Sequence, residues 1–157
     1  TYPELFAAVG AHSGLPHGSA RDMVGAMSVM AQGSAGFGWG PDQDAGTDRE
    51  TAIPVIVFQG DGDTRVHCSN AARIIAQFVP ETAPGCVRQP DVVAMQGGVR
   101  CVLTRYIHTS GAPLGELWML SGMTHAWSGG SPEGSFSEPR GPDASREMVR
   151  FFLSLQG

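Results

Sequence analysis

The 157-residue chain contains no lysine, only three cysteines, and no apolar run that approaches the ~20 residues of a membrane-spanning helix. Its basic residues are all arginines that lie singly along the sequence, so no basic stripe indicates nucleic-acid binding. The formal net charge is −5, and 41% of the residues are hydrophobic, which is too many for a disordered chain. We therefore expect residues 1–157 to form a single soluble, mildly acidic globular domain.

The cysteines Cys68, Cys86 and Cys101 contain no C-x-x-C pair, so a zinc site is not favoured. Two alternatives stay open: simple thiols, or one disulfide between Cys86 and Cys101 if the protein is exported. The chain begins at Thr1 without an initiator Met, a basic segment or an apolar signal segment. We therefore expect it to be a processed product or a fragment.

Short apolar runs alternate with helical patterns along the chain. Residues 5–11 and 54–58 predict strands buried on both faces, because they are continuous and end at turn residues. Residues 20–32, 69–79 and the segment after Pro142 predict helices, the second of them capped by Ser69. The predicted inward faces are Met23, Val24, Met27 and Met30; Ala71, Ala72, Ile74, Ile75 and Phe78; and Met148, Val149, Phe152 and Leu153.

Residues 102–108 and 115–120 flank Ser110-Gly111-Ala112-Pro113 and predict a hairpin. Residues 33–52, 81–100 and 128–142 lack periodicity and are interpreted as loops or surface connections. Strands that alternate with helices indicate an α/β domain with a mostly parallel sheet and flanking helices.

Polar loops follow the predicted strands, and in such sheets functional groups gather there. Asp61 and Asp63 lie in one loop, where a carboxylate could orient a histidine or simply form an Asx turn. A calcium-binding loop is not favoured, because the later calcium ligands are missing from this segment. His125 follows the last strand, and alone it would be more typical of a structural histidine. An acid followed by a histidine, each after a strand, matches the chain order of one class of catalytic triad.

Three segments carry a family resemblance: TYPELFAAVGAHSGLPHG (1–18), IPVIVFQGDGDTRVHCSN (53–70) and MTHAWSGG (123–130). They resemble esterases of the poly(3-hydroxybutyrate) depolymerase family, which are α/β-hydrolases related to secreted feruloyl and acetylxylan esterases. The resemblance implies that Asp63 is the triad acid, that His125 is the general base and that Asp61 forms a turn. It also implies hydrolysis of polymeric or small esters through an acyl-enzyme, no metal or organic cofactor, and a secreted or periplasmic location.

The chain departs from the family at the nucleophile, because no serine lies in a G-x-S-x-G motif. Ser13 comes closest but lies in Ala-His-Ser-Gly-Leu. The resemblance places the nucleophile upstream of Thr1, so we expect a single partial domain, the C-terminal half of an α/β-hydrolase fold, that is inactive alone. The alternative is a non-catalytic binding or structural module that lacks the nucleophile.

Other interpretations follow from this half-fold. The first strand, around residues 6–11, would expose its edge, so we expect the chain to self-associate, misfold or require the missing half. Trp127 would line an acyl or aromatic pocket or serve packing. His12 and Ser13 would lie at a strand end facing the site or, as we prefer, form a turn. Residues 33–52, with Phe37 and Trp39, would form a lid or, as we prefer, a surface loop; Arg65 and His67 are expected to be exposed.

Overall fold

The structure, a computed structural model, describes residues 5–33, 53–80 and 82–156. Residues 34–52, which make up nearly all of the segment interpreted as a surface loop, therefore lie outside the described residues. The strands of the main sheet are β1 (Val9–His12), β2 (Val55–Gly60), β3 (Cys86–Arg88), β4 (Val92–Gln96), β5 (Val99–His108) and β6 (Pro113–Leu120). The helices are α1 (Met23–Gln32), α2 (Ser69–Phe78) and α3 (Ala144–Leu153), which a 3-10 turn (Ser154–Gln156) follows.

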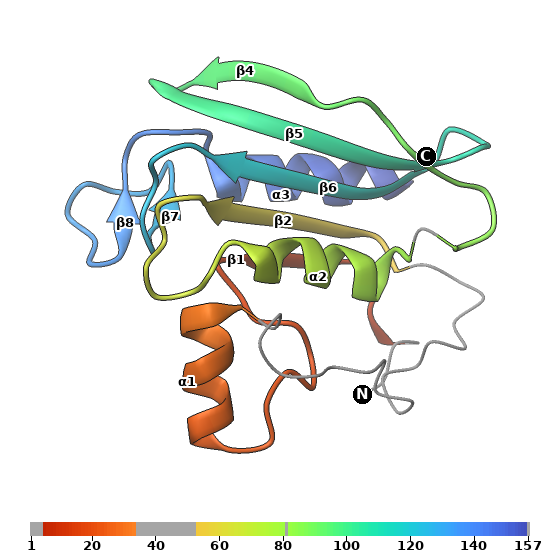
Figure 1. Cartoon of the computed structure of the whole chain (residues 1–157). Helices are drawn as coiled ribbons and strands as arrows, with labels where there is room; N and C mark the ends of the chain where they lie inside the picture. The colour runs from red at the N-terminus through yellow and green to blue at the C-terminus, as the bar shows by residue number, and fades with distance from the viewer. Residues whose placement is uncertain (1–4, 34–52, 81, 157) are drawn as a thin grey trace.

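The main sheet has the strand order β1-β2-β6-β5-β3, and β4 also pairs with β5 (Figure 1). Strands β1, β2 and β6 run parallel, whereas β5 is antiparallel to β6, to β3 and to β4. A second, very small parallel sheet joins β7 (Trp127–Ser128) to β8 (Ser137–Glu138). The prediction of an α/β domain is confirmed, with a sheet that is parallel at one side and antiparallel at the other.

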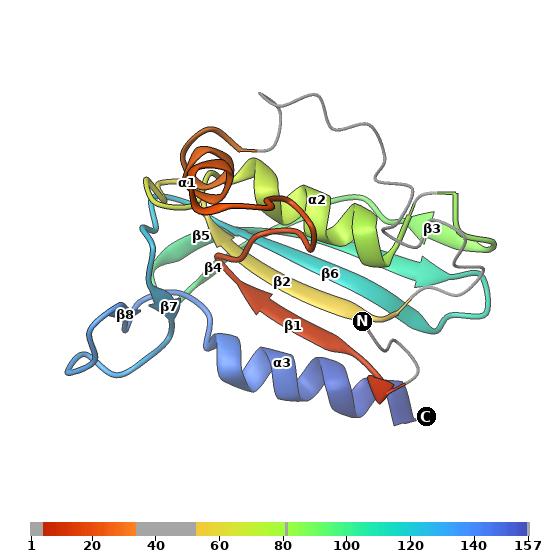
Figure 2. The ribbon, with the colours of Figure 1, turned by 90° about the horizontal axis from the view of Figure 1, so that it is seen from below.

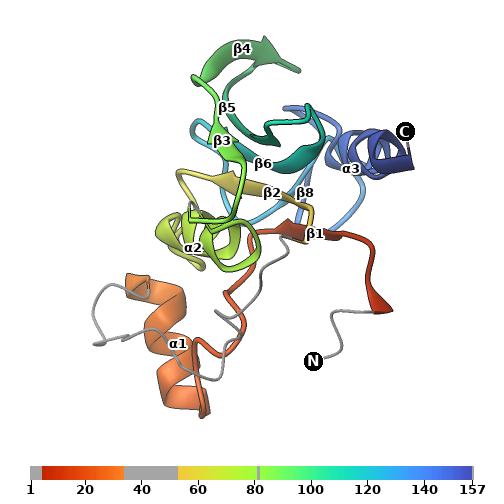
Figure 3. The same cartoon turned by 90° about the vertical axis from the view of Figure 1, so that its right-hand side faces the viewer.

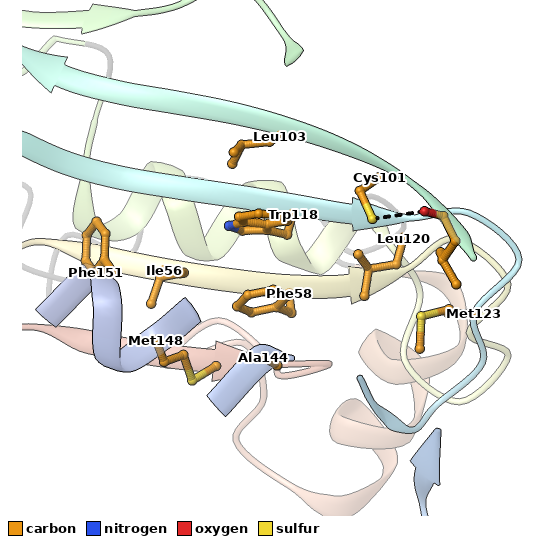
Figure 4. Close-up of a cluster of buried hydrophobic side chains, with 11 residues drawn as sticks. Ile56, Phe58, Cys101, Leu103, Trp118, Leu120, Met123, Ala144, Met148 and Phe151 are labelled. Carbon is orange, nitrogen blue, oxygen red and sulfur yellow. Dashed lines mark hydrogen bonds between the residues drawn. The ribbon is translucent and has the colours of Figure 1, made fainter. Parts of the chain in front are cut away.

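Helices cover both faces of the sheet: α2 packs on one face and α3 on the other (Figures 2 and 3). Strand β2 explains this arrangement, because all six of its residues are buried and successive side chains point to opposite faces. Val55 and Val57 pack toward α2, whereas Ile56 and Phe58 pack with residues of α3 (Figure 4). The unbroken apolar run in the sequence is therefore a strand buried on both faces, as predicted.

The predicted hairpin is confirmed by the antiparallel pairing of β5 with β6. The interpretation of residues 81–100 as a surface connection overlooks two strands, because β3 and β4 lie within it and pair with β5. Their apolar residues, Val87, Val92, Val93 and Met95, are all exposed. These strands thus form without the alternation between buried and exposed residues that would reveal them in a sequence.

No disulfide joins Cys86 to Cys101. Cys86 pairs with His108 at one end of β5, and Cys101 lies seven residues back along that strand. At about 3.4 Å per residue, the two Cα atoms are on the order of 20 Å apart, far beyond the reach of a disulfide. Of the two alternatives for this pair, the disulfide is wrong; Cys101 is a buried thiol.

The methionine stripe predicted to face the core from the first helix is exposed. Met23, Val24 and Met27 of α1 all lie at the surface, and Val29 is the buried residue of this helix. The predicted face of α3 is also partly wrong, because Val149 and Leu153 are exposed. The buried positions of α3 are instead Ala144, Met148 and Phe151, at spacings of four and three residues.

Helix α2 is buried along Ala71, Ile74 and Ile75 as predicted, but Ala72 is exposed. The predicted cap at Ser69 is also wrong, because the N-cap residue is Cys68, whose side chain makes no capping hydrogen bond; the N–H of Ser69 donates instead to Nδ1 of His67 (3.2 Å). Within the described residues, no helix combines the length and apolar character needed to cross a membrane.

Strand β1 differs from the prediction in its length and its burial. It begins at Val9 rather than near Leu5, and Leu5 and Phe6 are exposed. Its residues are at most half-buried, because β1 lies at one end of the strand order and only β2 pairs with it among the described residues. An apolar edge strand of this kind is able to pair with another chain.

We predict that residues 1–157, expressed alone, associate through this edge. Light scattering should show dimers or larger particles at micromolar concentration. The double variant Leu5→Glu, Phe6→Glu should shift the distribution toward monomer, because it replaces the exposed apolar residues just before β1 with charges that disfavour association. A monodisperse wild-type monomer with a cooperative calorimetric transition would contradict this prediction.

Candidate active site

Two loops leave the sheet side by side, after β2 and after β6. The strands are parallel neighbours, and Gly60 at the end of β2 pairs with Leu120 at the end of β6. The main-chain N–H of Asp61 donates to the Leu120 carbonyl (3.1 Å), and that of Gly62 donates to the Met123 carbonyl (3.1 Å). The Asp61 side chain also accepts from the N–H of Gly122 (2.6 Å), so Asp61 ties the two loops together.

Gly60 makes this close approach possible. A Cβ atom at Gly60 would overlap the carbonyl oxygen of Met123 and lie 2.7 Å from its carbonyl carbon. Both atoms belong to the backbone and cannot rotate away. The Met123 side chain is itself buried in the core, and this burial holds the loop after β6 against the end of β2.

Asp63 is the buried carboxylate of the first loop, and its side chain has no exposed surface. Oδ1 accepts from the N–H groups of Arg65 and Val66, each at 2.9 Å. Oδ2 accepts from Nε2 of Gln59 at 3.2 Å and lies 2.9 Å from Nδ1 of His125. Four hydrogen bonds therefore fix the position of this carboxylate.

Burial by itself would raise the pKa of Asp63. The hydrogen bonds from Val66 N–H, from His125 and from Arg65 N–H outweigh this effect and lower the pKa below its ordinary value. Asp63 is therefore a carboxylate at neutral pH.

His125 lies in the second loop with Nδ1 toward Asp63, and 31% of its side chain is exposed. When the ring is neutral and Nδ1–H donates to the carboxylate, the lone pair lies on Nε2. A histidine oriented in this way can accept a proton at Nε2, while the carboxylate stabilises the imidazolium that forms. Ser128 anchors the far end of this loop, because it is buried and its hydroxyl donates to the Pro142 carbonyl (2.7 Å).

Trp127 lies beside this pair but contacts His12 rather than His125. Its indole stacks on the His12 ring with 5.0 Å between centroids, and its Nε1 donates to Ser145 Oγ (3.1 Å). His12 also stacks on Phe58 at 5.8 Å, so its ring is held between two aromatic groups. Trp127 keeps 38% of its surface exposed, which leaves part of the indole accessible.

His12 also holds the His125 loop through a hydrogen bond. Its Nε2 accepts from the N–H of Ser128 (3.1 Å), so the proton of the neutral ring lies on Nδ1, which donates to Ser13 Oγ (3.2 Å). Burial, together with the nearby His125, lowers the pKa of His12 to about 4, although Asp63 opposes this shift. His12 is therefore neutral at neutral pH, and its Nε2 remains a hydrogen-bond acceptor.

Because the pKa of His12 is lowered on folding, we predict that the free energy of unfolding depends on pH. Between pH 6.5 and about 4 the unfolded chain binds a proton at His12 that the folded protein does not, so stability decreases as the pH falls. The largest slope is about 1.4 kcal/mol per pH unit. Urea denaturation should show the free energy of unfolding of wild type falling toward that of His12→Gln across this window, since the glutamine does not titrate. A difference that is constant from pH 7 to pH 4 would contradict the assignment.

A family model described as esterase PHB depolymerase matches residues 1–100. The chain belongs to this family of esterases. No curated protein matches the chain. The family description places the chain among hydrolases that act on esters, and ester substrates follow from it. Within the described residues, no group of three or more His, Cys, Asp or Glu side chains could hold a metal ion.

The matched residues include Asp63 but end before His125. His125 lies outside the matched residues, and its side chain meets Asp63 across 62 residues of sequence. The structure thus brings together the acid and the histidine named from the sequence, and it places Asp61 in a turn beside them. Arg65 and His67 are exposed, as expected.

Gln59 is not singled out by the sequence, and His12 is interpreted as part of a turn, yet both side chains touch this site. Gln59 is fully buried and donates to Asp63, while His12 supports the loop that carries His125. A signal for both exists, since each is a polar residue at the end of an apolar strand. The sequence alone favours a simple turn at His12, because nothing in it places residue 12 beside residue 128.

Proposed function

We propose that this chain carries the acid and the base of a serine esterase whose nucleophile lies upstream of Thr1. The observation that carries the proposal is the 2.9 Å contact between Nδ1 of His125 and Oδ2 of Asp63, a carboxylate that three further hydrogen bonds hold in place. This pair lies at the carboxyl ends of two parallel strands, where α/β sheets carry their functional groups. Membership of the esterase family supports the same reaction class.

In the proposed reaction, Nε2 of His125 accepts the proton of the serine hydroxyl as Oγ attacks the ester carbonyl. The tetrahedral intermediate collapses when the carbon–oxygen bond to the alcohol breaks, and the alcohol leaves with the proton from Nε2. Water then attacks the acyl-enzyme, giving its proton to Nε2. Release of the acid returns that proton to the serine oxygen. Asp63 stays ionised throughout and stabilises the imidazolium.

The proposed reaction uses no metal or organic cofactor. We further propose, on family membership alone, that the full-length protein is secreted or periplasmic. Residues 1–157 would then be one part of a catalytic domain, inactive without the rest of it. Trp127 is proposed to line the substrate site through its exposed surface.

The location of the nucleophile is tested in the full-length protein, expressed from the complete gene. A fluorophosphonate probe should label one serine, and mass spectrometry should place it in a G-x-S-x-G motif upstream of Thr1. Protein denatured before addition of the probe serves as the control. Absence of labelling, together with a gene that encodes no such serine, would favour a non-catalytic module. Labelling of a serine within residues 1–157 would overturn the upstream location.

A further inference from the structure

Phe136 adopts a backbone conformation that an aromatic residue rarely adopts. It lies just before β8, its φ is +58°, and 62% of its surface is exposed. A bulky side chain is strained in the left-handed region, where glycine or asparagine would be accommodated at lower cost. Burial in the core does not compensate for this strain. Such outliers cluster at functional sites, where the strained geometry is part of what the site does.

The surroundings of Phe136 point to the same site. Its carbonyl accepts from the N–H of Trp127 (2.8 Å), which fixes it beside the His125 loop. Its ring meets the His125 ring edge-on, with 6.3 Å between centroids and 77° between planes. On the other loop, the Arg65 guanidinium carbon lies 5.2 Å from the centroid of the same ring.

The Phe136 ring therefore contacts both loops of the candidate site. Arg65 belongs to the acid loop, since its main-chain N–H donates to Asp63. The cation and the imidazole hold the ring in one orientation, and much of the ring still faces solvent. An exposed aromatic surface held next to a general base is suited to contact an apolar part of a substrate.

We propose that Phe136 determines specificity by binding the apolar part of the alcohol that leaves the ester. This inference rests on the proposed function, in which His125 returns its proton to the leaving oxygen. Groups beside His125 therefore face the alcohol side of the scissile bond rather than the acyl side. The substrates favoured are esters of alcohols with an apolar chain.

The test compares two ester series in the full-length protein. One series holds the acid as butyrate and varies the alcohol from methanol to pentanol; the other holds the alcohol as methanol and varies the acid over the same lengths. Phe136→Gly should lower kcat/KM for pentyl butyrate about tenfold more than for methyl butyrate, because the methylenes lose an apolar contact. The acyl series should change equally at all lengths. Phe136→Tyr keeps the ring and should behave as wild type.

Thermal denaturation separates this role from a structural one. Phe136→Gly and Phe136→Asn both relieve the strained conformation, so the melting temperature should stay level or rise while the preference for longer alcohols is lost. A clear fall in melting temperature in both variants would mean that the ring is structural and would overturn the inference. So would an unchanged alcohol preference in an active Phe136→Gly protein. If wild type and all variants hydrolyse no ester, the proposed function fails, and the inference that rests on it fails with it.

Discussion

Replacing Asp63 by Asn should lower kcat for ester hydrolysis by about 10⁴-fold in the full-length protein, whereas the same change at Asp61 should leave kcat within about twofold. An Asn at position 63 can present its amide to His125 and favour the tautomer with the proton on Nε2, which then cannot accept one from the serine. Asp61 contributes one oxygen to the Gly122 N–H, and Asn retains that acceptor. The two carboxylates are two residues apart, so the pair of variants is closely matched.

The measurement is steady-state hydrolysis of a small ester, with circular dichroism to show that both variants fold. His125→Ala should reduce kcat at least about a thousandfold, because members of a triad act as a unit. His17→Ala is the control, since His17 is exposed and lies outside the candidate site. Equal losses in the Asp61 and Asp63 variants would show that the acid is misassigned, and full activity in His125→Ala would remove the proposed base.

Replacing Gly60 by Ala should destabilise the protein by about 3 kcal/mol or more, at the upper end of the cost of overpacking. The added methyl group would overlap the Met123 carbonyl, so the loops after β2 and β6 would have to separate. Because Asp63 and His125 lie on those loops, ester hydrolysis should fall as well. The readouts are the midpoint of urea denaturation and kcat.

Gly14→Ala is the matched control for this variant. A Cβ at Gly14 would make ordinary contacts, the nearest being Cδ1 of Ile74 at 3.6 Å. We expect its free energy of unfolding to lie within about 1 kcal/mol of the wild-type value. A Gly60→Ala protein as stable as the control would mean that the loops can move apart freely, contrary to the tight main-chain contacts between them.

The parts of the fold that could be predicted are those with a strong local pattern. The buried strand β2 and the β5–β6 hairpin follow from continuous apolar runs and a short turn. Strand β4 could not be predicted in this way, because its apolar residues are exposed and its existence depends on pairing with β5. The prediction that the methionines of α1 are buried is wrong for the opposite reason. An apolar stripe on a helix indicates one face, but it does not show that another element covers that face.

The candidate site divides along the same line. Asp63 and His125 could be named because both follow strands and lie in segments that resemble an esterase family, and the structure places their side chains in contact. His12 and Phe136 could not, because each reaches the site only through the arrangement of elements distant in sequence. Residue 12 meets residue 128 because β1 lies beside β2, an order that no local pattern encodes.

The main-chain hydrogen bonds between the two loops have a practical consequence for protein engineering. The separation of the acid and the base depends on amides and carbonyls that every residue except proline supplies. Exposed side chains in these loops, such as Thr64 and Thr124, can therefore be randomised in a library without changing the distance that joins the pair. Substrate range and reaction chemistry would be separately adjustable, with variation directed to the exposed residues 131–133, 135 and 136 and with the glycines at 60, 62, 129, 130 and 141 held constant.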